Sequence, residues 1–221
     1  MKKMAALAFA LIVSTSVVPA ASAAVISFDL DIEFSGATPP AGTAPWLRIS
    51  FDDFGGSGSV QVTMEAIGLT GDEFVSGWYF NFDPTLNAAA HLPTPVANPN
   101  VGWDSISAGN NAFKADGDGF YDFLVSFADA PVSDRFQGGE SLVLNITGVG
   151  LTASSFDYLS APAGGHGPFH TAAHVQGIGT GGQLSGWIAN SVGSRDVPEP
   201  TTLTLVLLGL AFGAARMRKK P

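Results

Sequence analysis

The chain has 221 residues, a formal charge of −9 and no cysteine, so it has room for one domain and excludes disulfides, thiolate metal sites and thiol catalysis. Six of its ten cations lie near the two ends, and residues 24–196 carry four cations against eighteen acids, a formal charge of −14. A body this acidic repels phosphate backbones, which argues against nucleic acid as a partner.

The N-terminal segment has the three-part layout of a secretory signal peptide. Lys2 and Lys3 precede an apolar stretch over residues 4–18, and Ala21-Ser22-Ala23 places small residues before a cleavage site. We therefore expect residues 1–23 to be a signal peptide that signal peptidase removes after Ala23, recognising Ala21 and Ala23.

Apolar and polar residues alternate in the segment that follows the signal peptide. Ile26, Phe28, Leu30, Ile32 and Phe34 are separated by single polar residues, which is typical of a half-buried strand with all five on one face. Similar patterns predict strands over 46–51, 59–67, 74–82, 120–128, 142–149, 172–178 and 184–189.

Eight or more short strands predict an all-β domain over residues 24–190. The expected architecture is an antiparallel β-sandwich or jelly roll of two packed sheets, with a single barrel as the alternative. Residues 84–100 contain four prolines, and we expect them to form a surface loop or one short helical turn.

An aspartate-rich loop precedes one of the predicted strands. Asp116, Asp118 and Asp122 match the third, fifth and ninth positions of an EF-hand loop. Lys114 and Val125 replace its first and last acidic ligands, so a complete EF-hand is excluded. Two interpretations remain, a partial calcium site completed by other oxygens or a polar turn, and no other cofactor is expected.

Other candidate chemistry is weaker. His166, His170 and His174 would align for zinc on a helix, but the glycines around His166 favour a loop followed by a strand. The adjacent acids Asp52-Asp53 and Asp72-Glu73 could serve glycoside hydrolysis, although adjacent loop acids are usually solvated. No G-x-S-x-G elbow is present. We expect a protein that is not an enzyme, with a secreted hydrolase as the weakest alternative.

Four tryptophans, Trp46, Trp78, Trp103 and Trp187, would stack on sugar rings if they lined one exposed groove. If all four are in the core, this interpretation fails. A calcium-assisted carbohydrate-binding module is therefore the alternative function.

The C-terminal segment reads as an anchor. After a linker over 191–196, residues 197–221 contain Pro198-Glu199-Pro200 and then fifteen uncharged residues, 201–215. As a helix this run spans roughly 22 Å, against about 30 Å for a hydrocarbon core, so we expect one short transmembrane helix. The basic residues that end the chain would stay cytoplasmic and leave the body outside. They are Arg216, Arg218, Lys219 and Lys220.

This combination of a Pro-Glu-Pro signature, an apolar helix and a basic end resembles the PEP-CTERM proteins. The resemblance implies a Gram-negative, exopolysaccharide-producing bacterium whose membrane transpeptidase, exosortase, recognises the tail and cleaves near it. The protein would be anchored in the inner membrane in transit, with its body in the periplasm, and would then reach the cell surface or extracellular matrix. Exopolysaccharide is the further partner that the resemblance implies, with biofilm or floc formation as the setting.

The body also resembles a recurring subgroup of PEP-CTERM proteins. The similar segments are 44–47, 79–83, 116–122 and 172–176. The resemblance supports one β-rich domain and implies no activity.

Overall fold

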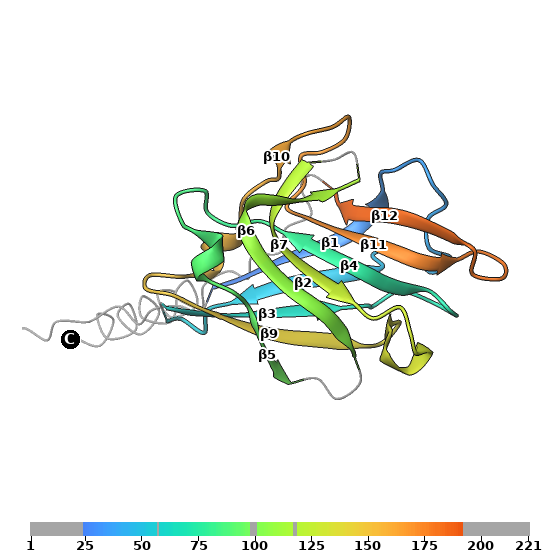
Figure 1. Cartoon of the computed structure of the whole chain (residues 1–221), viewed down its shortest axis with the longest axis horizontal. Helices are drawn as coiled ribbons and strands as arrows, with labels where there is room; N and C mark the ends of the chain where they lie inside the picture. The colour runs from blue at the N-terminus through green and yellow to red at the C-terminus, as the bar shows by residue number, and fades with distance from the viewer. Residues whose placement is uncertain (1–23, 57, 98–100, 117–118, 192–221) are drawn as a thin grey trace, which may run out of the picture.

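The computed structural model describes residues 24–56, 58–97, 101–116 and 119–191, which form an all-β unit (Figure 1). The strands are β1 (Val25–Glu33), β2 (Leu47–Asp52), β3 (Ser59–Glu65), β4 (Phe74–Phe80), β5 (Thr94–Ala97), β6 (Trp103–Ala115), β7 (Gly119–Phe127), β8 (Phe136–Gln137), β9 (Ser141–Thr147), β10 (Ala161–Pro162), β11 (Thr171–Ile178) and β12 (Leu184–Asn190). Three short 3-10 helices connect them: η1 (Ala88–Ala90), η2 (Val132–Asp134) and η3 (Ala153–Phe156).

Backbone hydrogen bonds join all twelve strands into one antiparallel sheet. Its order is β10-β7-β4-β11-β12-β1-β2-β3-β9-β5, with β6 paired to β7 and β8 to β4. The predicted all-β, antiparallel fold is confirmed, but the prediction of two separate sheets is wrong. The sheet is also open, because its end strands β10 and β5 are not paired with each other in the described residues.

The open sheet curls so that its two halves pack face to face. The ring of Phe51 on β2 lies 5.7 Å from that of Phe80 on β4 and 4.6 Å from that of Phe156 on η3. Phe80 stacks on Phe123 of β7 at 4.7 Å. These contacts place the main core between the two halves, where the inner faces of a sandwich would meet.

A bulge in β1 corrects the predicted face of that strand. Ile26, Phe28 and Leu30 point into the main core, but the pairing of β1 with β12 shifts register between Leu30 and Ile32. Ile32 and Phe34 consequently pack in a second, smaller cluster. Neighbouring residues of β11 and β12 divide between the two clusters, so the second cluster lies on the other face of the sheet.

Four strands fall where none was predicted: the two-residue strands β8 and β10, and the longer β5 and β6. Residues 84–97 contain η1, the predicted helical turn, but then form β5, which pairs with β9. The thirteen-residue β6 is mostly exposed or half-buried and pairs along β7. Its polar sequence lacks the alternation that marks the other long strands.

No helix within the described ranges is long and apolar enough to cross a membrane. The predicted signal peptide, residues 1–23, and the predicted transmembrane helix over 201–215 both lie outside those ranges.

Candidate functional site

The residues predicted to direct export and sorting lie outside the described residues. This applies to Ala21 and Ala23 at the signal cleavage site and to the sorting tripeptide Pro198, Glu199 and Pro200. It applies equally to the basic flank of Arg216, Arg218, Lys219 and Lys220. The described body shows instead where the chain enters and leaves the fold.

Both ends of the described body are tied down by aspartates. The backbone nitrogen of Ala24, just before β1, donates to Asp53 Oδ1 at 3.0 Å. At the other end, Ser191 donates its backbone N–H and its hydroxyl to the two oxygens of Asp31, at 2.8 and 2.9 Å. Asp31 lies near the C-terminal end of β1, whereas Ala24 lies just before its N-terminal end. The points where the chain enters and leaves the described body, which we call the two exits, are therefore roughly 20 Å apart along that strand.

The predicted calcium loop lies in the β6–β7 hairpin. Asp116 is exposed with a positive φ of 41°, and Asp118 lies outside the described residues. Asp122 is buried, and its two oxygens accept the backbone N–H groups of Asn111 at 2.6 Å and Phe82 at 2.9 Å. Burial raises the pKa of Asp122, and the two backbone hydrogen bonds oppose that rise. This carboxylate therefore joins β6 to the segment that follows β4.

Calcium binding at this loop stays a prediction. Among the residues that the structure describes, no three histidines, aspartates or glutamates are grouped to hold a metal ion. Asp118 is not one of those residues.

The four tryptophans do not share one exposed groove. Trp46 and Trp78 are buried, and their indole N–H groups donate to Gly42 O and Thr171 Oγ1. Trp103 is 40% exposed on β6, whereas Trp187 is half-buried on β12, and three strands separate them in the sheet. The fold therefore does not bring the four tryptophans together into a sugar-binding site.

The three predicted histidines lie in different environments. His166 is exposed in the loop before β11. His174 on β11 is half-buried, with its Nδ1 at 2.8 Å from Ser76 Oγ and its ring 4.7 Å from that of Trp187. Burial lowers the pKa of His174, although Asp129 and Asp116 oppose this shift. The predicted loop followed by a strand is confirmed for this segment.

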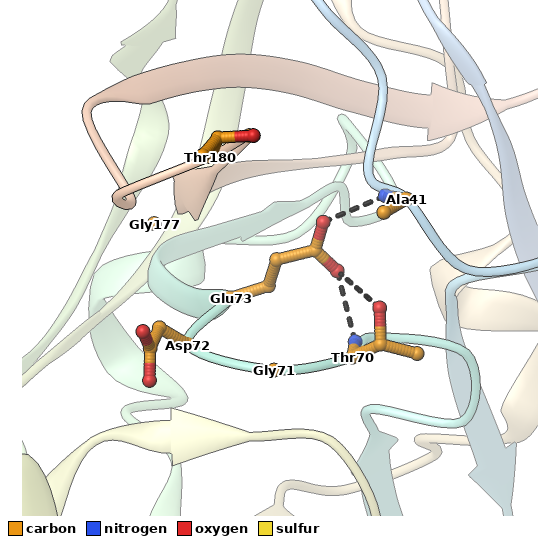
Figure 2. Close-up of a pocket in the computed structure, with 8 residues that line it drawn as sticks. Ala41, Thr70, Gly71, Asp72, Glu73, Gly177 and Thr180 are labelled. Atoms are coloured by element: carbon orange, nitrogen blue, oxygen red, sulfur yellow. Dashed lines mark hydrogen bonds between the residues drawn. The ribbon is translucent and has the colours of Figure 1, made fainter.

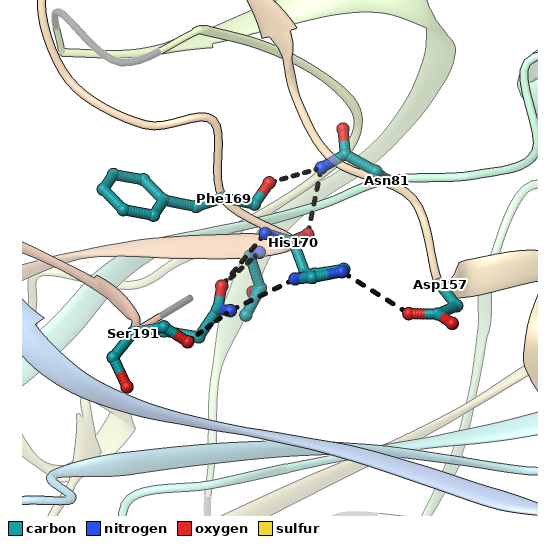
Figure 3. Close-up of polar contacts among 7 residues, drawn as sticks. Asn81, Asp157, Phe169, His170 and Ser191 are labelled. Carbon is teal, nitrogen blue, oxygen red and sulfur yellow. Dashed lines mark hydrogen bonds and ion pairs between the residues drawn. The ribbon is translucent and has the colours of Figure 1, made fainter. Parts of the chain in front are cut away.

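His170 is the centre of a polar network just before the start of β11 (Figure 3). Its ring stacks on Phe28 at 4.4 Å. The Asn190 amide nitrogen lies 3.2 Å from Nδ1, and Asp157 Oδ1 lies 3.4 Å from Nε2. Because an amide NH₂ can only donate, Nδ1 accepts and the proton lies on Nε2, directed at Asp157. Nδ1 thus ties the loop before β11 to β12, and Nε2 faces the segment that follows η3.

A polar hollow lies between the β3–β4 turn and the β11–β12 hairpin (Figure 2). Its volume is about 410 Å³, and its lining includes Thr70, Asp72, Gly177 and Thr180. Glu73 forms one wall and is only 2% exposed, with its carboxylate accepting the N–H groups of Ala41 at 2.6 Å and Thr70 at 2.8 Å. Glu73 therefore holds the rim of the hollow in shape.

A second hollow of about 400 Å³ adjoins the first, and both are lined by Asp72 and Gly177. Arg135 lines the second hollow with its guanidinium 4.2 Å from the centre of the Phe74 ring. Its Nε donates to Asp129 O at 2.7 Å, and its terminal nitrogens have no protein acceptor among the described residues. Gln176 and Gln183 complete the polar wall. We call the two hollows together the Asp72 groove.

The Asp72 groove is equipped to bind hydroxyl groups. Guanidinium, carboxylate and amide side chains each offer two polar atoms in one plane, which suits neighbouring hydroxyls of a sugar ring. The ring of Phe74 is covered by Arg135 and is only 4% exposed, so stacking on this aromatic is not available. Recognition here would rest on hydrogen bonds.

Sequence reasoning missed this groove and assigned both pairs of adjacent acids to solvent. The structure corrects half of that prediction, because Asp53 and Glu73 are buried while their neighbours are not. The strand pattern gives a weak signal for this, since Glu73 precedes the buried strand β4 directly.

Comparison with known families places one feature on the chain. Residues 196–219 match the family described as the PEP-CTERM protein-sorting motif, which confirms the motif predicted from the tail. The matched segment includes Pro198-Glu199-Pro200. The search of curated proteins and the search of solved structures found no match for the chain.

Proposed function

We propose that this chain is an exported protein that exosortase sorts through its C-terminal segment to the cell surface or extracellular matrix. The PEP-CTERM motif at residues 196–219 is the observation that carries the proposal, because such a motif implies an extracellular protein that crosses the membrane and is processed by exosortase. The signal-peptide layout of residues 1–23 supports the same route, since it would start export.

The chemistry of the tail suits a temporary anchor. The uncharged run over 201–215 is shorter than a typical hydrocarbon core, and the basic end holds it in one orientation. Pro198 and Pro200 disfavour a helix in residues 197–200, which we call the neck, and favour an extended form that a processing enzyme can bind. Exosortase then separates the body from the apolar helix.

The body is proposed to act without catalysis, as a displayed domain in contact with exopolysaccharide. Its charge of −14 over residues 24–196 keeps it soluble and separate from other acidic surfaces. Biofilm or floc formation is the proposed setting.

Substitution of the tripeptide tests the sorting proposal. Replacing Pro198, Glu199 and Pro200 by alanine in the native host should leave the protein uncut in the inner-membrane fraction, because the neck loses its extended form and its acid. Replacing Thr201 and Thr202 by alanine is the matched control and should leave sorting unchanged. Equal amounts of the triple variant and the wild type at the cell surface, by fractionation and immunoblotting, would contradict the proposal.

The Asp72 groove favours carbohydrate binding as a second candidate function. Asp72 and Arg135 supply opposite charges beside Gln176 and Gln183, and the terminal nitrogens of Arg135 have no acceptor among described protein groups. A polyhydroxylated chain would supply the missing partners. In this second candidate function, sugar binding depends on hydrogen bonds in the Asp72 groove and not on stacking against a row of tryptophans.

Binding of the exported protein to neutral and uronate-containing oligosaccharides, followed by calorimetry, tests this candidate. Asp72→Asn combined with Arg135→Gln should weaken binding about thirtyfold, because two polar contacts of roughly 1 kcal/mol each are affected. Asp52→Asn, an acid outside the groove, should leave affinity unchanged. Repeating the titration with calcium and with a chelator tests the calcium loop, and an unaltered affinity in the double variant would exclude the groove.

A further inference from the structure

Asp53 is a buried carboxylate whose partners include the first residue of the expected mature chain. It follows β2 and is only 6% exposed. Oδ1 accepts hydrogen bonds from the backbone nitrogens of Ala24 at 3.0 Å and Gly55 at 2.9 Å. Oδ2 accepts one from the backbone nitrogen of Ala153 at 3.1 Å. The backbone of Asp53 donates in return to Ala24 O at 3.3 Å. Ala24 is thus held by both the side chain and the backbone of one residue.

Backbone hydrogen bonds, and no described lysine or arginine, stabilise the negative charge of the Asp53 carboxylate. Burial raises the pKa of Asp53, but the hydrogen bonds from Ala24, Ala153 and Gly55 outweigh it and keep the pKa below its ordinary value of 3.8. No described lysine or arginine lies within ion-pair distance of it. The carboxylate is therefore ionised at neutral pH and electrostatically unpaired in the described part of the chain.

Signal peptidase would supply the missing cation. Cleavage after Ala23 breaks the peptide bond between Ala23 and Ala24, and water adds its hydroxyl to the Ala23 carbonyl and a proton to the Ala24 nitrogen. An α-amino group has an ordinary pKa of about 7.7–8.0 and takes up a further proton at neutral pH. The atom that donates to Asp53 then carries a positive charge.

We infer that Asp53 is a binding site for the α-ammonium group of Ala24, formed when the signal peptide is removed. The inference rests on the proposed export of the chain. The neutral hydrogen bond between these atoms becomes a charge-assisted ion pair, which is stronger. Oδ2 simultaneously holds η3, whose Phe156 stacks on Phe51 in the core. The new N-terminus is thereby fastened to the packing of the domain.

Only one position of the cut places the new ammonium group at Asp53. Cleavage one residue earlier or later would move the ammonium group by about 3.4 Å along the strand, away from hydrogen-bond distance to Asp53. The ion pair thus stabilises one product of cleavage over its neighbours.

The test uses exported protein purified from the host, whose first residue is identified by mass spectrometry. Its thermal unfolding is measured at pH 6.5 with the α-amino group free and after selective acetylation of that group. Acetylation should lower Tm by about 3 °C in the wild type, because the charge is lost. It should have the same effect in Asp52→Asn, the matched control, and none in Asp53→Asn.

Several results would overturn the inference. If the mature protein begins at Ala24 and acetylation leaves its Tm unchanged, the inference is overturned but the proposed export is not. The same holds if the exported protein begins at another residue. A surface protein that retains residues 1–23 would overturn both the inference and the proposed route. If Asp53→Asn does not fold, the comparison of acetylated and free wild-type protein still decides.

Discussion

Asp53, Glu73 and Asp122 are each less than 7% exposed, and each accepts hydrogen bonds from at least two backbone N–H groups, at least one of which comes from a distant part of the chain. Such hydrogen bonds offset the cost of burying a carboxylate. These residues join loops to strands in a protein that has few cations and no disulfide.

Asp122 provides the test of this role. Asp122→Asn keeps the shape but leaves one oxygen for two N–H donors, so one buried donor loses its acceptor. We expect a loss of about 1–3 kcal/mol in the free energy of unfolding, measured by urea denaturation of the exported protein. Asp116→Asn, on the exposed turn of the same hairpin, should change it by less than about 0.5 kcal/mol. Equal effects of the two substitutions would contradict the anchoring role.

The sequence could not predict which of two adjacent acids is buried. Asp52-Asp53 and Asp72-Glu73 look alike as pairs, yet only Asp53 and Glu73 are buried. The difference depends on which backbone N–H groups of distant segments, such as Ala153 and Ala41, arrive beside each carboxylate. Local pattern contains no information about those partners.

The strands with strict alternation were predictable, because period two reports one buried face. β2 and β9 follow the pattern throughout, with alternate residues in the core. β1 departs from it at the bulge, and β6 shows no pattern because much of it is exposed and polar. Pairing in one continuous sheet was not predictable either, since alternation does not specify partners.

Gly177 marks a close approach between two elements. It is a bulge residue of β11 with φ of +76°, and a Cβ there would lie 2.2 Å from Asp72 O. Gly181, in the following hairpin, has a similar φ of +84° but open space around it. Comparing substitutions at Gly177 and Gly181 therefore separates the cost of a positive φ from the cost of a steric clash at the added Cβ.

Gly177→Ala should destabilise the domain by roughly 2–4 kcal/mol, because the methyl group forces the β11 bulge away from the β3–β4 turn. Gly181→Ala should cost about 1 kcal/mol through its positive φ alone. Denaturant unfolding of the two variants measures the difference. Equal costs would show that the approach of Gly177 to Asp72 is not tight.

At the scale of the whole molecule, charge and hydrophobicity are divided along the chain. The acidic body has a −14 charge over 24–196, and the apolar run and four cations of the tail follow it. The matched sorting motif lies in that tail. This division was readable from sequence because it depends on composition and order, whereas the Asp72 groove depends on the meeting of distant turns.

The two exits of the body suit a protein processed at both ends. Ala24 and Ser191 are each held by an aspartate, at opposite ends of β1. The sheet pairing of β1 with β2 and β12 involves only residues between these two points, so we expect it to persist when the terminal segments are removed. The folded body can be kept as the terminal segments are removed.

The most direct test of tail-directed sorting is the C-terminus of the mature protein. Mass spectrometry of protein recovered from the cell surface should find no peptide containing Arg216–Pro221, while a host strain lacking exosortase should retain those residues in the membrane fraction. Mature surface protein that still ends in Arg216–Pro221, or identical C-termini in the two strains, would contradict the account.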